Sequence, residues 1–355
     1  MSRQTILFIP VSQKLGSGEY FRCLSLARSL QSQDTSIDLH ICANKAADVP
    51  VVDGIEVHRL DDSPTYCSEE VDQLIQQLKP SVVVFDNTLR REQLQSCKRH
   101  GARTVFISSR PKKRRTGFSP RKLRLLDEHW VIGSPDEHHL HSYEKLLLKS
   151  LNPAAQVRFF ASMQPPADPQ RRQRLLESHS FNHSEYVLFA PGGGSGYVEG
   201  YPTAELFQRA ARQFEAETGK PTIFVAGPMS ETALDSTENR LEIRAVSTEE
   251  FVDLIDGAKI FVTGAGSQLW QALVMHKPCV AIPTTGKEQP ARLTAMVKHG
   301  VVIEANRTPE SLNEYARGLA LSHRKQKSLQ EQITLAGYRE GLQTASDSVV
   351  NLFET

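Results

Sequence analysis

Short apolar runs alternate with amphipathic stretches along almost the whole chain. In the first half, the runs predict strands at 5–10, 37–42, 55–60, 81–85, 104–108, 129–132 and 157–161. The stretches between them predict helices, most clearly at 19–30, 69–78 and 92–100. This alternation is typical of βαβ units and parallel sheets.

The alternation is interrupted at residues 164–169, where Pro165, Pro166 and Pro169 prevent regular structure. It then resumes, with strands expected at 186–190, 222–226, 241–245, 260–263, 279–283 and 301–304, and helices at 203–217, 248–256, 268–275, 291–298 and 309–321. We therefore predict one domain at 1–164 and a second at 165–322. Residues 323–355 are polar and weakly periodic, and we expect one or two surface helices that pack back across the domains.

The economical architecture is α/β, with two Rossmann-like parallel-sheet domains facing each other across a cleft. Ligands of such sheets bind beyond the carboxyl ends of the strands. The loops that follow strands are therefore the segments to search for chemistry.

Composition and charge narrow the class of protein. The 355 residues are 39% hydrophobic and include 42 basic and 41 acidic side chains, but residues 1–164 carry a net +5 and the remainder a net −4. The five cysteines are scattered without metal-ligand spacing, and no run approaches the ~18 apolar residues of a membrane span. We expect a soluble, cytoplasmic protein with reduced thiols, and leave peripheral membrane contact open.

The first loop of interest follows the first expected strand and contains Gly16, Ser17, Gly18, Glu19 and Arg22. Glycines allow close approach of the backbone, and a helix N-terminus presents free N–H groups to a polar ligand. As a dinucleotide fingerprint it is poor, because Phe21 stands where the third glycine would be. Glu19 is also explained as an acidic residue favoured in the first turn of a helix.

Four loops of the second half follow expected strands and are rich in small residues. They contain Gly192, Gly193, Gly194 and Ser195, then Gly227, then Gly264, Ala265, Gly266, Ser267, Gln268 and Gln271, and finally Glu288 and Gln289. Four glycines among residues 192–196 suit a phosphate or diphosphate, although a flexible turn is the alternative. The loop with Gly227 is also explained as a plain turn.

These segments resemble nucleotide-sugar glycosyltransferases of the GT-B fold. The segment from Gly264 to Gln271, with Pro278, Pro283 and Glu288-Gln289, is similar to the donor-binding domain of glycosyltransferase family 28, the murein N-acetylglucosaminyltransferase group. The segment from Gly16 to Arg22 is similar to the G-x-G-H-x-x-R motif of that group and of related UDP-sugar hydrolases of pseudaminic acid synthesis.

The resemblance implies roles for individual residues. The Gly192–Gly194 loop and the Gly264–Ser267 loop would hold the donor diphosphate, Gln271 would contact the ribose, and Glu288 and Gln289 the sugar. Gly227 and Gln268 are further donor-binding candidates. Gln271 stands where the family usually has glutamate, and Glu19 where it often has histidine. Glu19 is therefore a candidate general base whose role is in question. No Asp-x-Asp motif is present, so we expect neither metal nor other cofactor.

Two further features of the first half concern the acceptor. Asp86 ends an expected strand and is either a second catalytic candidate or a helix cap. Residues 110–124 hold eight basic side chains and no acidic one, Lys112, Lys113, Arg114 and Arg115 among them. The run is a solvated face or mobile loop, or it binds an anionic acceptor or anionic membrane at about 1 kcal/mol per residue.

We therefore expect a glycosyltransferase that moves a sugar, without a metal ion, from a nucleotide-diphosphate donor, UDP first, to an acceptor hydroxyl of a lipid-linked, anionic or small-molecule glycan. A role in envelope or secondary-metabolite glycan assembly fits this expectation. The alternatives are a nucleotide-sugar hydrolase and a GT-B protein that binds nucleotide or glycan without turnover. Nucleic acid is not an expected partner, since the basic run lacks interleaved aromatic residues.

Overall fold

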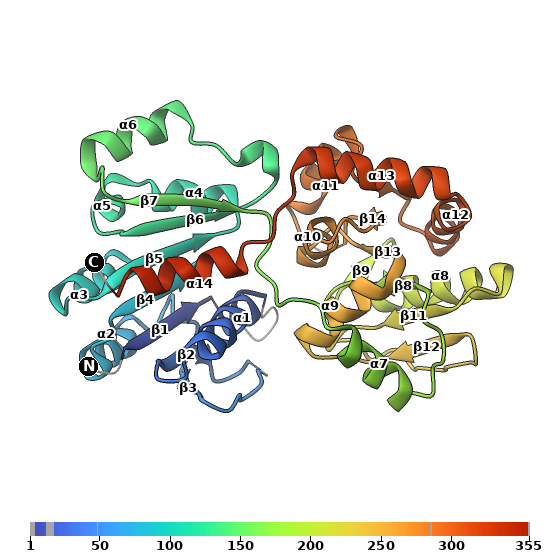
Figure 1. Ribbon diagram of the computed structural model, residues 1–355, viewed down its shortest axis with the longest axis horizontal. Helices are drawn as coiled ribbons and strands as arrows, with labels where there is room; N and C mark the ends of the chain where they lie inside the picture. Colours follow the sequence, from blue (N-terminus) through green and yellow to red (C-terminus); the bar gives the residue numbers. More distant parts are fainter. Residues whose placement is uncertain (1–3, 12–17, 48, 285, 354–355) are drawn as a thin grey trace. The chain divides into compact units, whose positions relative to one another are not determined.

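The computed structural model describes residues 4–11, 18–47, 49–284 and 286–353. The chain divides into two compact units, one of residues 1–164 with 339–355 and the other of residues 165–338 (Figure 1). Each unit is an α/β layer structure built on a parallel sheet, which confirms the predicted fold class. All five cysteines are buried and free, and no helix in the described part of the chain is long and apolar enough to cross a membrane.

The first unit contains a seven-stranded sheet in the order β3-β2-β1-β4-β5-β6-β7, and all neighbouring strands are parallel. The strands are β1 (Thr5–Pro10), β2 (Asp38–Asn44), β3 (Ile55–Leu60), β4 (Val82–Asp86), β5 (Arg103–Ser108), β6 (Glu128–Ile132) and β7 (Gln156–Phe160). The helices are α1 (Gly18–Gln33), α2 (Ser68–Leu78), α3 (Arg91–Arg99), α4 (Pro111–Gly117), α5 (Pro120–Leu123), α6 (Ser142–Leu151) and α14 (Leu342–Asn351), with a 3-10 turn at Pro135–Glu137.

The apolar runs become strands because side chains on both faces of this sheet are buried. Ile6 and Phe8 of β1 belong to a core with residues of α1 and α14, whereas Leu7 and Ile9 belong to a second core with residues of α2 and α3. Successive side chains of a strand point to opposite faces, so a strand covered on both faces is mainly apolar along its length.

The second unit contains a six-stranded parallel sheet in the order β12-β11-β8-β13-β14-β15. Its strands are β8 (Tyr186–Ala190), β11 (Thr222–Val225), β12 (Arg240–Ile243), β13 (Ala258–Gly264), β14 (Cys279–Ile282) and β15 (Ile303–Glu304), and a short hairpin pairs β9 (Tyr197–Val198) with β10 (Tyr201–Pro202). The helices are α7 (Pro169–Ser178), α8 (Thr203–Thr218), α9 (Thr248–Gly257), α10 (Ser267–Val274), α11 (Gln289–Lys298), α12 (Pro309–Ala320) and α13 (His323–Ala336).

The C-terminal segment is divided between the two units. Helix α13 belongs to the second unit, while the chain from residue 339 onward belongs to the first, where α14 lies against α1 (Figure 1). Ala345 and Val349 are fully buried in the first unit's core, and Ser348 Oγ lies 2.7 and 2.6 Å from the two carboxylate oxygens of Glu128. The last helix thus completes the first unit.

The basic run at 110–124 differs from the expected mobile loop, because it forms α4 and α5. Its basic side chains other than Arg114 are exposed or half-buried, as the solvated-face alternative expects. Each helix begins with a proline at its first position, where the missing N–H has no intrahelical partner to lose. Leu123 and Phe118 are buried beneath the two short helices.

Candidate functional site

The predicted donor residues lie at one edge of the second unit's sheet. The loops at 191–196, 226–230, 265–267 and 283–288 follow β8, β11, β13 and β14, which are neighbours in the order β11-β8-β13-β14. Because all four strands are parallel, their carboxyl ends share an edge. The structure therefore places these loops side by side, but their contact with a donor remains a prediction.

Two of these loops pack so closely that they require glycine. A Cβ on Gly194, whose φ is +79°, would lie 2.3 Å from Ala226 O, and one on Gly227, whose φ is +95°, would lie 2.5 Å from Gly192 O. Met229 N donates to Gly193 O at 3.0 Å across the same contact. Side chains here would separate the loops, so these glycines are explained by packing alone.

The loops after β13 and β14 are joined to the rest of the edge by Gly264 and Gln289. A Cβ on Gly264 would lie 2.7 Å from Pro191 O and 2.9 Å from Thr284 Cγ2. The Gln289 side chain is buried, and its Oε1 accepts from Thr284 N at 2.6 Å and from Thr284 Oγ1 at 3.0 Å. Gln289, expected to contact a sugar, holds the backbone of its own loop. Its neighbour Glu288 is exposed at the N-cap of α11.

Two other glycines of this edge, Gly193 and Gly266, have free space where a Cβ would lie. A Cβ on Gly193 would meet only Met229 Sδ at 4.0 Å, and one on Gly266 only Gln289 Nε2 at 3.8 Å, and neither glycine has a positive φ. Their lack of a side chain is therefore not explained by packing or by backbone conformation within the described residues. Space left above a backbone in this way suits a ligand that approaches closely.

The N-terminus of α10 adds polar groups to this open region. Gly266 is its N-cap, no side chain caps the helix, and Ser267 is exposed at the first position. The first N–H groups of a helix have no intrahelical partner and favour an anion. Gln268 Oε1 is buried and has no hydrogen-bond partner among the described residues, which is costly unless a ligand or a water molecule donates to it. Gln271 lies one turn further along and is half-buried.

Arg292 is a residue of this edge that the sequence analysis missed. Its guanidinium donates to Ala265 O at 3.2 Å and lies 5.4 Å above the ring of Trp270. It therefore brings a cation to the 264–267 loop. The sequence feature that could have indicated Arg292 is its position one helical turn after Glu288, which places both residues on the same side of α11.

In the first unit, Glu19 and Asn87 lie together at the corresponding edge. Glu19 lies in the first turn of α1, the helix after β1, and Asn87 follows β4. Asn87 Nδ2 donates to Glu19 Oε1 at 2.9 Å and to Ser109 Oγ at 2.6 Å, and the Arg110 guanidinium lies 3.6 Å from the same Glu19 oxygen. Asn87 has φ +54°, a left-handed conformation that Asn tolerates better than most residues. Asn87 was not predicted, although an Asn directly after a strand was the available signal.

Asp86 and Arg22 form a buried ion pair beside this network. Arg22 Nε donates to Asp86 Oδ2 and Arg22 Nη2 to Asp86 Oδ1, both at 2.7 Å, and Asp86 is fully buried. Burial raises the pKa of Asp86 to about 6, and the Arg22 guanidinium opposes that shift. Both carboxylate oxygens are engaged, so the geometry suits positioning of Arg22 rather than the catalytic role considered for Asp86.

The four predicted basic residues of α4 differ in burial, since Arg114 is buried, Lys113 is half-buried, and Lys112 and Arg115 are exposed. Arg114 is buried and makes a bidentate ion pair with Glu144 at 2.9 and 2.7 Å, so it supports the fold and differs from the expected acceptor contact. Lys112 and Arg115 line an open surface pocket of about 540 Å³ with Thr116, Ser119 and Lys122. Lys113 is half-buried, and burial lowers its pKa, reinforced by the charge of Arg110.

The remaining predicted acceptor residues lie at the start of α1. Gly18 is exposed at its first position, whereas Gly16 and Ser17 lie outside the described residues.

Comparisons with known proteins were made on sequence and on structure. No protein-family model and no curated protein matches the sequence. Solved structures match with high probability. A spinosyn forosaminyltransferase matches at 14% identity and a TM-score of 0.63, with all of both chains covered. The UGT2 protein of Phytolacca americana, complexed with UDP-2-fluoro-glucose and pterostilbene, matches at 11% identity and a TM-score of 0.63, with 99% of this chain and 100% of that chain covered. The glycosyltransferase VinC in complex with dTDP matches at 13% identity and a TM-score of 0.61, with 99% of this chain and 100% of that chain covered. Likeness at this identity establishes the GT-B fold.

Proposed function

We propose that this protein is a glycosyltransferase that takes a sugar from a UDP- or dTDP-linked donor. The observation that carries the proposal is the convergence of four strand-end loops on one edge of the second unit's sheet, with an uncapped helix N-terminus and two glycines whose missing side chains packing does not explain. Its GT-B neighbours include a complex with dTDP and one with UDP-2-fluoro-glucose, which supports the same class of donor.

The donor diphosphate is proposed to bind at Gly193, Gly266 and Ser267. The leaving nucleoside diphosphate gains negative charge as the bond to the anomeric carbon breaks. Backbone N–H groups at the start of α10 and the nearby Arg292 guanidinium would stabilise that charge. Gln268 Oε1 would accept from a hydroxyl of the bound nucleotide sugar, and Gln271 would contact the ribose. The proposal includes no metal ion.

The acceptor hydroxyl is proposed to bind at the Glu19 edge of the first unit. Glu19 would accept the hydroxyl proton as the acceptor oxygen forms its bond to the anomeric carbon and the diphosphate leaves with the bonding electrons. Asn87 and Arg110 fix the Glu19 carboxylate. The Asp86–Arg22 pair would hold α1 to β4 and so position Glu19. Lys112, Lys113 and Arg115 would attract an anionic acceptor or an anionic membrane surface, with a cytoplasmic setting and a role in glycan assembly as part of the proposal.

Turnover of nucleotide sugars tests this proposal. We expect release of UDP or dTDP that increases when an acceptor glycan or alcohol is present, and a loss of at least a hundredfold in kcat for E19Q with an unchanged melting temperature. E92Q is the control, because Glu92 is also a first-turn carboxylate, in α3, and it is exposed. Full activity of E19Q would eliminate Glu19 as the base.

The same assay separates the alternatives. Free sugar formed without acceptor at a rate comparable to transfer would identify a hydrolase, and binding of nucleotide without any turnover would identify a binding protein. Failure of every UDP and dTDP sugar both to bind and to react would contradict the proposed function itself.

A further inference from the structure

Three potential metal ligands meet on one face of the first unit's sheet, away from the loops described above. His40 lies within β2, and Glu56 and His58 lie within the edge strand β3. His40 pairs with Glu56 in the parallel register, and His58 is two residues further on, so all three side chains project from the same face. Their nitrogen and oxygen atoms lie within 4.8 Å of one another.

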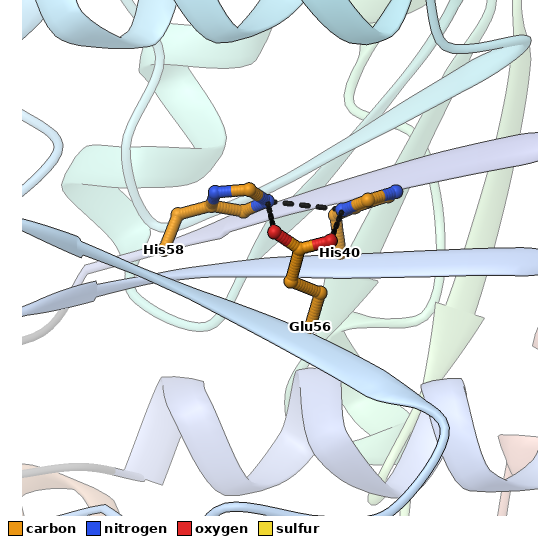
Figure 2. Close-up of side chains that lie close together, drawn as sticks. All are labelled: His40, Glu56 and His58. Carbon is orange, nitrogen blue, oxygen red and sulfur yellow. Dashed lines mark hydrogen bonds and ion pairs between the residues drawn. The ribbon is translucent and has the colours of Figure 1, made fainter.

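The atoms converge as metal ligands do. His40 Nδ1 lies 2.9 Å from His58 Nε2 and 3.4 Å from Glu56 Oε2, while Glu56 Oε1 lies 3.8 Å from His58 Nε2. Figure 2 shows the two rings with the Glu56 carboxylate directed at both nitrogens. Ligand atoms about 2.0–2.1 Å from a tetrahedral zinc ion are separated from each other by roughly 3.3 Å. Small side-chain adjustments would therefore accommodate the ion.

The contacts within this cluster depend on which imidazole nitrogens carry a proton. His40 is buried, and a neutral imidazole has one N–H and one lone pair. If Nδ1 donates to His58, the Nε2 lone pair faces Asp38 Oδ2 at 3.1 Å. If Nε2 carries the proton, it points to Asp38, and Nδ1 can accept from His58 Nε2 while Glu56 Oε2 lies 3.4 Å away. Among the described residues, His40 Nε2 has this contact with Asp38 but no aligned hydrogen bond. A cation between the three ligands would bind both imidazole lone pairs and the carboxylate together.

We propose that His40 Nδ1, His58 Nε2 and the Glu56 carboxylate bind one zinc ion. Imidazole and carboxylate are the ligands that Zn²⁺ takes in proteins, and water would complete a tetrahedron on the exposed side of Glu56. His40 Nε2–H would then point to Asp38, the carboxylate–histidine–zinc arrangement that orients a ligating ring. The ion would fasten the edge strand β3 to β2, and it has no part in the proposed transfer reaction.

Zinc binding to the full-length chain without a polyhistidine tag tests the proposal. We expect one zinc ion per chain by elemental analysis, and binding at least tenfold weaker by competitive titration in E56Q and in H58Q. E69Q and H100Q are the matched controls, because both residues are exposed and remote in sequence from the cluster. Since the Glu56 side chain is 65% exposed, E56Q will fold even if H58Q does not.

A positioning role for Asp38 is tested by D38N, which we expect to weaken zinc binding about tenfold while the visible absorption bands of bound Co²⁺ remain those of a tetrahedral site. Zinc should also raise the melting temperature of the natural chain and not that of E56Q. Absence of saturable one-to-one zinc binding, or equal affinity in E56Q and E69Q, would overturn the site and leave a histidine pair joined by a hydrogen bond.

Discussion

At the scale of single residues, Gln289 and Gln268 of the predicted donor segments differ in the hydrogen bonding of their side chains. Gln289 uses its side-chain oxygen to hold Thr284, whereas Gln268 Oε1 is buried with no partner in the described chain. A satisfied buried amide stabilises the folded state, while an unsatisfied one costs free energy that a donor from a ligand or a water molecule recovers. Gln289 therefore has a structural role, whereas Gln268 is a candidate for the proposed donor contact.

Leucine substitutions of these glutamines should have contrasting effects. We expect Q289L to lower the free energy of unfolding by about 1–3 kcal/mol, because Thr284 N loses its acceptor. Q268L should leave stability unchanged or slightly raised and weaken nucleotide-sugar binding. Chemical denaturation and titration calorimetry measure both effects. A marked loss of stability in Q268L would show that Gln268 is structural.

His129 gives the first unit a pH dependence of stability. Burial lowers its pKa from 6.5 to about 3, and the charge of Arg114 acts in the same direction. Below pH 6.5 the unfolded chain therefore takes up a proton that the folded chain does not, so this contribution to stability is complete above that pH and is lost as pH falls toward 3.

Replacing His129 by phenylalanine should remove that contribution. The ring already packs 5.1 Å from Phe106 and 4.8 Å from Phe118, so the aromatic volume is retained. In H129F we expect the slope of unfolding free energy against pH between 4 and 6 to fall by about one proton. Denaturation at several pH values, with H100Q as control, measures it, and an unchanged slope would refute the assignment. Burial also raises the pKa of Asp86, and this gives the unfolding free energy a pH dependence of the opposite sign. That contribution is the same in the natural chain and in H129F.

At the scale of elements, α4 combines a buried support with an exposed cationic surface. Arg114 is fixed by Glu144, while Lys112 and Arg115 face the open pocket that Lys122 also lines. The helix thus presents its charges from a fixed backbone.

The double variant K112Q/R115Q should lose at least tenfold in affinity for vesicles containing anionic lipid, at about 1 kcal/mol per basic residue. The control R121Q/R124Q removes two exposed charges that do not line the pocket. Co-sedimentation measures the binding, and the acceptor KM should rise in parallel if the acceptor is anionic. Equal losses in both double variants would show that net charge alone matters.

Elements also show what the sequence pattern can and cannot predict. β1 and β8 occupy their predicted ranges, because strands buried on both faces leave continuous apolar runs. The edge strand β3 also occupies its predicted range, although its polar residues alternate with apolar ones. The expected strands at 301–304 and 241–245 are shorter or shifted, since only residues 303–304 and 240–243 pair. The helices α4 and α5 were not predicted, because their basic sequence shows no clear apolar periodicity. Part of their support comes from Glu144 and other residues distant in sequence.

At the scale of the whole molecule, the chain makes two units that each have their own core. Periodicity predicted two parallel sheets, but the return of α14 to the first unit rests on Ser348 with Glu128 and on Ser346 with Ser29, contacts between residues hundreds of positions apart. No local pattern encodes such pairing. The loop residues of the candidate site were predicted as candidates because they follow apolar runs in the sequence. Arg292 and Asn87 were identified only from the structure.

The affinity of UDP for the natural chain, G266A and G318A tests the central claim most directly. Both glycines have room for a Cβ, and Gly318 lies within α12, far in sequence from the donor loops. We predict that UDP binds the natural chain and G318A equally, and that G266A binds at least tenfold more weakly with an unchanged melting temperature, because the methyl group would occupy the space of the diphosphate. No binding of UDP or dTDP to the natural chain, or equal affinity in all three, would contradict the account.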